Sequence, residues 1–340
     1  MRIQPLCTDE HLARGNPRLI CLGPCALGGS LVMDYTTGSV YRVQGEREGE
    51  GEGLYTLSLF REGWEQNFAG TAATVCQGSV YVWGKTPGDR SDCRMVRQCI
   101  ETGAWEDCPR KGDRPRAGRE VILLTVTDRV LLIDCSLSPR EKCPTSLFDP
   151  SVSTWKRQRP GKAGILCDIT AYCLRGTVHL MGTLDEEDAV LRHLVFTPGE
   201  RGAKGKKAMG RWRETAMPEG FPEDFHCPSP IVLGGEEREG EQEVENYSES
   251  VLMLGYEDYA DGAPEPYWGV GGITAETTET ESNTSEPVVQ WTHLCNIGYQ
   301  VKQGIRLHDG TPRQAMIVQT SRRATDGHDK SVWEVLEMSE

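Results

Sequence analysis

The cysteines and histidines are the residues of this chain that could bind a metal ion. The thirteen cysteines are spread along the sequence, and the closest pairs are Cys21 with Cys25 and Cys93 with Cys99. A tetrahedral zinc site needs a second pair of ligands at chelating spacing, and no such pair follows either of these. We therefore expect no metal site.

Other signatures of catalysis are also missing from the sequence. The seven histidines occur one at a time, and His179 and His193 fall in strand-like segments, where a packed or surface histidine is the more frequent case. The glycines of residues 45–53 alternate with charged residues and do not join a strand to a helix, so they do not form a phosphate-binding loop. A serine nucleophile elbow is absent as well. The sequence predicts no catalytic residue and no cofactor.

Arginine is concentrated in two short stretches, RKGDRPRAGR (110–119) and KRQRPGK (156–162). Because arginine forms bidentate pairs with carboxylates, these stretches could bind an acidic surface of a partner protein. The alternative is that they are solvated connectors whose charges balance nearby acidic residues. The candidate contact residues are Arg114, Arg116, Arg119, Arg157 and Arg159.

The overall charge and hydropathy indicate which partners and which cellular compartments are unfavourable for this chain. Lys and Arg number 37 against 51 Asp and Glu, and the net charge of −14 repels nucleic acid and anionic lipid surfaces. No run reaches the roughly 18 apolar residues of a transmembrane helix, and the N-terminus lacks the apolar stretch of a signal peptide. Scattered cysteines in an odd number indicate reduced thiols. We expect a cytoplasmic protein or one of another reducing compartment, with organelle import open.

A repeated pattern of short strands indicates the elements that position these residues. Each repeat has two apolar segments around a tight polar turn, then a third β-like segment and a lone tryptophan. The clearest hairpins cover residues 71–84, 121–135 and 169–182. Four strands in each repeat, the last marked by the tryptophan, predict a four-stranded antiparallel blade.

The flanking sequence follows the same plan and brings the number of repeats to six. The last repeat lacks a fourth strand, which the N-terminal segment 2–7 can supply; this would close the ring and leave no open sheet edge. We therefore predict an all-β, six-bladed β-propeller that fills residues 1–340. The expected blades cover about 18–66, 67–115, 116–162, 163–220, 221–297 and 298–340.

These repeats resemble kelch repeats of the galactose-oxidase-like superfamily, over nearly the whole chain. The diglycine that usually ends the second kelch strand is replaced, so the chain resembles a divergent member. The replacing dipeptides are Gly84-Lys85, Asp134-Cys135, Gly182-Thr183 and Gly255-Tyr256. Some relatives of this fold are copper radical oxidases, which need a Cys–Tyr crosslink, a second tyrosine and two histidines. Tyr172 and Cys173 are neighbours in a strand, so their side chains point to opposite faces and do not fit that requirement.

The tryptophans fall into two groups. One in each of five repeats is expected to pack between neighbouring blades rather than to stack on a ligand. These are Trp64, Trp105, Trp155, Trp212 and Trp291. Of the three others, Trp268 follows Pro264 and Pro266 at a loop edge. Aromatic side chains are enriched at interface hot spots, so Trp268 is a candidate for contact with a partner.

Two functions follow as hypotheses. The favoured one is a non-catalytic protein–protein interaction scaffold, a subunit of a larger assembly, which binds an acidic partner surface through its propeller loops. The two arginine-rich stretches connect successive blades on one face of the disc and should lie side by side. The alternative is an enzyme or small-ligand binder with its site at the central channel. Converging histidine, tyrosine or carboxylate side chains on the innermost strands would favour that alternative.

Overall fold

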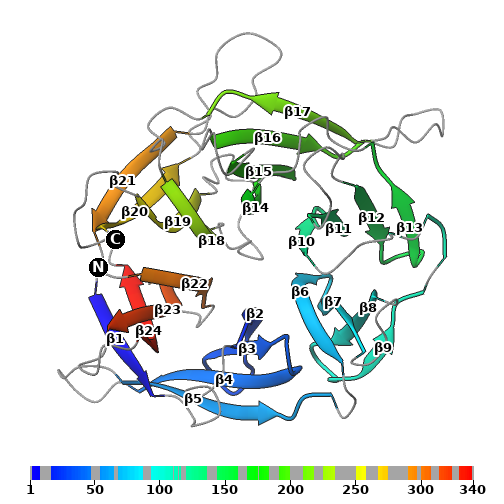
Figure 1. Ribbon diagram of the computed structural model, residues 1–340. Coiled ribbons are helices and arrows are strands. Elements are labelled where there is room, and N and C mark those ends of the chain that lie inside the picture. Colours follow the sequence, from blue (N-terminus) through cyan, green and yellow to red (C-terminus); the bar gives the residue numbers. More distant parts are fainter. Residues whose placement is uncertain are drawn as a thin grey trace, which may run out of the picture.

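The computed structural model shows mainly antiparallel β-sheets arranged around a centre (Figure 1). The described residues are 2–7, 17–46, 54–64, 68–86, 93–109, 111–113, 115, 120–135, 144–159, 167–174, 176–183, 191–199, 210–217, 225–233, 250–257, 267–274, 290–296, 300–307, 314–323 and 329–338. No helix long and apolar enough to cross a membrane occurs among them.

Four of the sheets have four strands each, paired in sequence order. The first contains β6 (Ala69–Cys76), β7 (Ser79–Lys85), β8 (Cys93–Cys99) and β9 (Trp105–Asp107). The second contains β10 (Val121–Val126), β11 (Arg129–Asp134), β12 (Thr145–Asp149) and β13 (Thr154–Arg157). The third contains β14 (Cys167–Leu174), β15 (Thr177–Thr183), β16 (Leu191–Thr197) and β17 (Arg211–Thr215). The fourth contains β18 (Phe225–Leu233), β19 (Ser250–Glu257), β20 (Tyr267–Thr274) and β21 (Gln290–Asn296).

The fifth sheet has eight strands, in the order β2-β3-β4-β5-β1-β24-β23-β22. The early strands are β1 (Arg2–Cys7), β2 (Leu19–Pro24), β3 (Ser30–Asp34), β4 (Ser39–Glu46) and β5 (Leu54–Arg61). The late strands are β22 (Gln300–Arg306), β23 (Gln314–Arg323) and β24 (Asp329–Met338). The two chain termini therefore lie close together in this sheet (Figure 1).

The prediction of six separate blades is wrong, because the structure has five sheets. The N-terminal strand β1 pairs antiparallel with β24, with Ile3 opposite Leu336. It also pairs in parallel with β5, where Leu6 lies opposite Tyr55 and Cys7 opposite Thr56. This second pairing joins the first and last four-stranded units into one continuous sheet. The expected antiparallel four-stranded plan and the propeller arrangement are confirmed.

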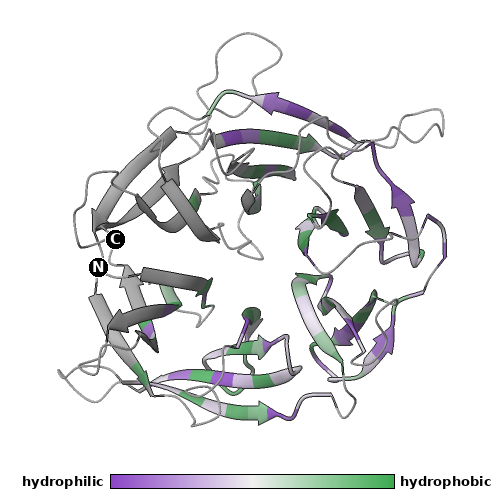
Figure 2. Cartoon of the chain, in the orientation of Figure 1, coloured by the Kyte–Doolittle hydropathy of each residue, from purple (hydrophilic) through white to green (hydrophobic). Residues whose placement is uncertain are grey.

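The core lies between neighbouring sheets, because successive residues of a strand point to opposite faces. In β10, Val121 and Leu123 pack toward the β6–β9 sheet. Ile122 and Leu124 pack toward the β14–β17 sheet on the other side. The middle strands are consequently hydrophobic, whereas the peripheral strands β13 and β17 are largely hydrophilic (Figure 2). A sheet of this kind needs a partner on each face, which the circular arrangement provides.

Candidate binding groove at the disc rim

The structure describes only part of the sequence-predicted contact set. Arg157, at the end of β13, and Arg159, two residues beyond it, are both exposed. Trp268 lies in β20, with its backbone opposite Tyr256, and its side chain is outside the described part. The remaining candidates, Arg114, Arg116 and Arg119, also lie outside the described residues.

Residues 111–113, within the first arginine-rich stretch, run alongside β13, the strand that leads into the second stretch. Gly112 forms a parallel bridge with Trp155 of β13. The Trp155 amide donates to the Lys111 carbonyl at 2.9 Å, and the Asp113 amide donates to the Trp155 carbonyl at 3.1 Å. Residues 111–113 of the first connection thus line the outer edge of β13 in the β10–β13 sheet.

The once-per-repeat tryptophans pack between sheets, as predicted, wherever their side chains are described. Trp155 of β13 lies 6.3 Å from Trp83 of the preceding sheet, ring centre to ring centre. The Trp212 indole N–H donates to Thr145 Oγ1 of the preceding sheet at 3.1 Å. Trp105 of β9 likewise lies next to a tryptophan of the preceding sheet, with its ring centre 4.6 Å from that of Trp64. Trp291 lies outside the described side chains.

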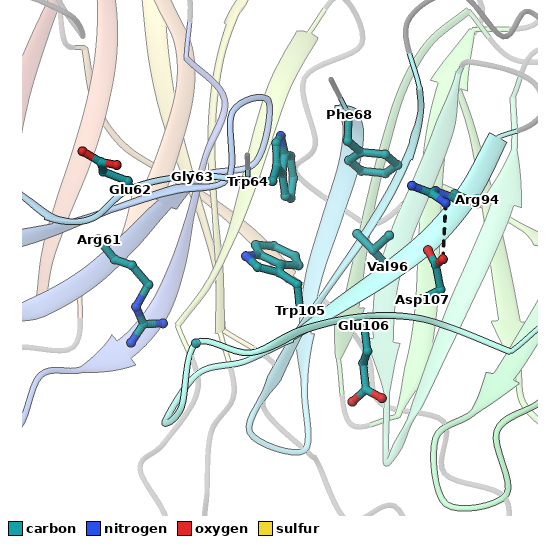
Figure 3. A pocket seen from close by; sticks show the side chains of 11 residues that line it. Arg61, Glu62, Gly63, Trp64, Phe68, Arg94, Val96, Trp105, Glu106 and Asp107 are labelled. Atoms are coloured by element: carbon teal, nitrogen blue, oxygen red, sulfur yellow. Dashed lines mark hydrogen bonds and ion pairs between the residues drawn. The ribbon is translucent and has the colours of Figure 1, made fainter. Parts of the chain in front are cut away.

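At the junction of the first two repeats, these aromatic side chains line an open groove instead of a closed core. This rim groove has a volume of about 530 Å³ and lies between the end of β5 and strands β8 and β9 (Figure 3). Trp64 and Trp105 are only half-buried there. The lining residues are Arg61, Glu62, Gly63, Trp64, Phe68, Arg94, Val96, Gly103, Trp105, Glu106 and Asp107. The rim groove therefore combines an aromatic floor with charged sides.

The charged groups of the rim groove differ in how they are paired. Arg94 forms an ion pair with Asp107 at 3.3 Å and lies 5.7 Å from the ring centre of Phe68. Glu106 accepts a hydrogen bond from Arg97 at 2.6 Å. Arg61 makes no ion pair within the described part of the chain; its guanidinium lies 5.8 Å from the Phe60 ring centre and beside Gly103. Of the two arginines that line the rim groove, Arg94 alone has an ion pair within the described residues.

The end of β5 carries two partly exposed apolar side chains that do not line the rim groove. Leu59 is 49% exposed and Phe60 is 40% exposed, whereas Leu57 earlier in the strand is buried. The pairing with β4 shifts by one residue here, since Tyr41 lies opposite Leu59 and Val40 lies opposite Arg61, and Phe60 is the extra residue of this β-bulge. Leu59 therefore shares the face of Tyr41, toward the last strands of the chain, whereas Arg61 shares the face of Val40, toward the β6–β9 sheet and the rim groove.

We predict that Gly38→Ala will disturb the rim groove through Trp64. Gly38 has φ of 77°, which favours glycine, and a Cβ there would lie 2.6 Å from the Trp64 ring. We expect a loss of about 1–3 kcal/mol in the free energy of unfolding, together with a changed Trp emission spectrum. Gly78→Ala is the matched control, because Gly78 has φ of 67° but open space at the Cβ position. Equal losses in both variants would mean that the Trp64 contact contributes nothing.

A second polar cluster crosses the β14–β17 sheet and is buried. His179 Nδ1 and His193 Nε2 share a hydrogen bond at 3.0 Å, and Thr215 Oγ1 lies 2.7 Å from His193 Nδ1. Tyr172 stacks on His179, with ring centres 4.9 Å apart. Burial, and then the neighbouring His193, lower the pKa of His179 to about 4, and burial also lowers the pKa of His193. Both rings are therefore neutral at pH 7.

Neither the rim groove nor the histidine pair has a metal-binding arrangement within the described residues, where no three His, Cys, Asp or Glu side chains converge. On the described innermost strands, the hydroxyl groups of Thr74 in β6 and Thr125 in β10 lie 3.0 Å apart. The eight described cysteines are free thiols.

The arrangement of sheets defines the protein as a β-propeller. No protein-family model matches the chain, and no curated protein matches it. Among solved structures, 193 chains match. One of them, titled "Structure of YjhT", is 8% identical in sequence with a TM-score of 0.49, over 95% of this chain and 98% of that chain.

Proposed function

We propose that this protein is a divergent kelch-like β-propeller that acts as a non-catalytic scaffold for protein–protein interaction, as a subunit of a larger assembly. The observation that carries this proposal is the exposed apolar surface of Leu59 and Phe60 at the end of β5. Exposed apolar side chains with a polar border are typical of protein interaction sites. Tryptophan and arginine, which line the rim groove, are the residue types that most often dominate binding energy.

The arginines of the connections offer a second surface for the same kind of partner. Arg157 and Arg159 are exposed, near the point where Lys111 meets Trp155. A partner with an acidic contact surface would pair with these arginines. The free thiols of the described cysteines favour a reducing intracellular compartment as the place where the assembly forms.

The double variant Leu59→Ser/Phe60→Ser tests whether the apolar surface at the end of β5 binds the partner. Both side chains are partly buried, at 49% and 40% exposed, so we expect a loss of about 1–3 kcal/mol in the free energy of unfolding. Retention of a stoichiometric partner from native extract should fall about tenfold or more. Size-exclusion chromatography followed by pull-down and mass spectrometry measures both quantities.

The comparison variant is Arg157→Glu/Arg159→Glu, which changes the second proposed surface and leaves the apolar surface of β5 intact. We expect this variant to lose part of the partner, but less than the Leu59→Ser/Phe60→Ser variant does. Loss of the partner here, with full retention by the Leu59→Ser/Phe60→Ser variant, would move the binding surface to the arginine-rich connections. A wild-type protein that elutes alone, with no partner, would contradict the scaffold proposal.

A further inference from the structure

We propose that the rim groove binds an arginine side chain from a basic segment of a partner protein, with the guanidinium stacked on Trp105 and paired with the carboxylate of Asp107. This inference rests on the proposed function, because the arginine belongs to a partner protein. It adds a contact that the proposed function does not include, at a site apart from the apolar surface of Leu59 and Phe60.

Trp105 and Asp107 present a flat ring and a carboxylate on one face of the sheet. They are two residues apart in β9, so their side chains point the same way. Their partners in β8 are Gln98 and Val96, and Val96 packs in the apolar cluster between this sheet and β2–β4. Both side chains line the rim groove, where Trp105 is half-buried (Figure 3). A planar guanidinium can lie on such a ring while it donates two hydrogen bonds to a carboxylate.

The ion pairs at the rim groove expose their carboxylates more than their guanidinium groups. The side chain of Asp107 is 63% exposed, whereas that of its partner Arg94 is 30% exposed. Glu106 is 57% exposed and its partner Arg97 is 31% exposed. A cation that approaches these pairs therefore meets carboxylate oxygens first. A carboxylate has two oxygens and about four lone-pair sites, so Asp107 can accept from a second arginine while it pairs with Arg94.

Arg94 shows that this surface holds an arginine between an aromatic ring and a carboxylate. Its guanidinium lies 5.7 Å from the ring centre of Phe68, and its Nη1 atom lies 3.3 Å from Asp107 Oδ2. Cation–π pairs have distances of up to about 6 Å between the cation and the ring centre, and tryptophan attracts a cation more strongly than phenylalanine does. A second guanidinium on Trp105 would make the same two kinds of contact, with a better ring.

Arg61, the other arginine of the lining, lies at the opposite end of the rim groove. Its guanidinium is beside Gly103, which comes before β9, whereas Asp107 is the last residue of β9. Figure 3 shows Arg61 and Asp107 on opposite sides of the two tryptophans. The exposed carboxylate of Glu62 follows Arg61 in the sequence and offsets its charge. The bound arginine is therefore expected at the Asp107 end.

The charge of the whole chain also favours a basic segment. Asp and Glu number 51 against 37 Lys and Arg, and the net charge is −14. Such a charge attracts a basic segment at long range and raises its rate of association. One partner can offer a basic segment here and an acidic surface to Arg157 and Arg159, because β13 and the rim groove belong to different sheets.

The experiment uses a library of random peptides displayed on phage, selected on the immobilised full chain and depleted on the Asp107→Asn variant. We expect the enriched peptides to contain arginine. In synthetic versions, citrulline in place of this arginine keeps the planar shape but removes the charge, and it should weaken binding about tenfold. Lysine should weaken binding about threefold or more, because an ammonium group does not stack or pair at two points. Fluorescence anisotropy measures each affinity.

The variants assign the contacts to single residues. Asp107→Asn should weaken binding of the arginine peptide about tenfold and that of the citrulline peptide little. Glu214→Gln is the matched control, because Glu214 is an exposed carboxylate of an outer strand that pairs with Arg192 of the neighbouring strand, at 2.9 Å. Trp105→Leu should weaken binding about tenfold, and Trp105→Phe, which keeps a ring, should weaken it less. Circular dichroism checks that each variant is folded.

Each other outcome would overturn the inference. Enriched peptides that are acidic, or that lack a basic residue, would exclude an arginine as the bound group. Equal losses for Asp107→Asn and Glu214→Gln would mean that only net charge matters, and equal affinity of the arginine and lysine peptides would exclude stacking of the guanidinium. The same holds if no peptide distinguishes the wild type from Asp107→Asn.

These outcomes are distinguishable from a failure of the proposed function. The scaffold proposal would still stand if the Leu59→Ser/Phe60→Ser variant loses the partner from native extract while no peptide depends on Asp107. A wild-type protein that elutes alone from extract would contradict the scaffold proposal, whatever peptides the rim groove binds.

Discussion

Trp155→Ala should lower the free energy of unfolding by about 3–5 kcal/mol, which is the largest loss we expect from any single described side chain. Trp155 is only 4% exposed and belongs to the apolar cluster that joins the β6–β9 and β10–β13 sheets. Its ring lies 5.1 Å from Phe148 and 6.3 Å from Trp83, centre to centre. Removal of the indole would leave a cavity between two sheets that cannot collapse without shifting both. Urea denaturation followed by circular dichroism measures this loss.

Trp105→Ala is the matched control for this prediction. Trp105 has the same position in its repeat, but it lies half-buried in the rim groove, next to Trp64. Since solvent already reaches this indole, its loss should destabilise the fold clearly less than Trp155→Ala. A larger loss for Trp105→Ala would contradict the assignment of Trp155 as the packing residue and Trp105 as the exposed one.

The local pattern of the sequence was enough to predict the hairpins. The segment 71–84 corresponds to β6 and β7, and 121–135 corresponds to β10 and β11. Apolar strand residues and tight turns are local features of the sequence. They are pronounced here because each sheet packs against a neighbour on both faces and therefore needs apolar residues on both. The packing role of the recurring tryptophans could also be predicted, because a residue that recurs once per unit occupies an equivalent place in each unit.

The joining of the terminal units into one sheet could not be predicted in the same way. The pairing of Leu6 with Tyr55 is parallel and connects residues far apart in the sequence. Pairing between two strands that are distant in sequence depends on which strand edges meet in the folded chain. The pattern of apolar residues along each strand does not predict which edges meet. The sequence did indicate that β1 could complete the last unit, but it contained no signal for the second partner of β1.

The apolar surface of β5 was missed because its signal is a departure from the repeat. Leu59 and Phe60 are consecutive apolar residues before Arg61, and this breaks the alternation of the strand. On its own, such a pair is read as an ordinary buried strand segment, and only the exposed fractions of the two side chains in the folded chain show that they lie at the surface. The predicted arginine contacts, by contrast, were chosen for their charge, which gives no information on where they lie in space.

The histidine pair leads to the second prediction with a large effect, which concerns pH. We expect the free energy of unfolding to fall by about 2 kcal/mol between pH 7 and pH 5 through His179 alone. The folded protein holds this pKa at about 4, whereas the ordinary value of 6.5 applies to the unfolded chain. Within that window the unfolded state binds a proton that the folded state does not, so stability decreases as the pH falls. His193, whose pKa is also lowered, adds to the effect in the same direction.

The structural reason for this pH dependence is that the described surroundings of the histidine pair offer neither solvent nor a hydrogen-bond acceptor to stabilise a protonated His179 ring. His179 is 5% exposed, and its Nε2 atom has no hydrogen-bond partner within the described part of the chain. The other ring nitrogen faces His193, so a proton on either ring would place a charge beside a second imidazole in a buried layer. Tyr172 stacks on the His179 ring, with ring centres 4.9 Å apart.

His179→Gln is the test variant, because glutamine keeps a polar group beside His193 but does not titrate. The quantity to compare is the change in urea midpoint between pH 7 and pH 5, measured for wild type and variant with the same m-value. This comparison removes any constant loss caused by the substitution, and it also removes the contribution of carboxylates, which titrate in both proteins. We expect a clearly smaller change in the variant. Equal changes would show that protonation of His179 does not oppose folding. The folded protein would then have to accept a proton on His179 while its hydrogen bond with His193 remains.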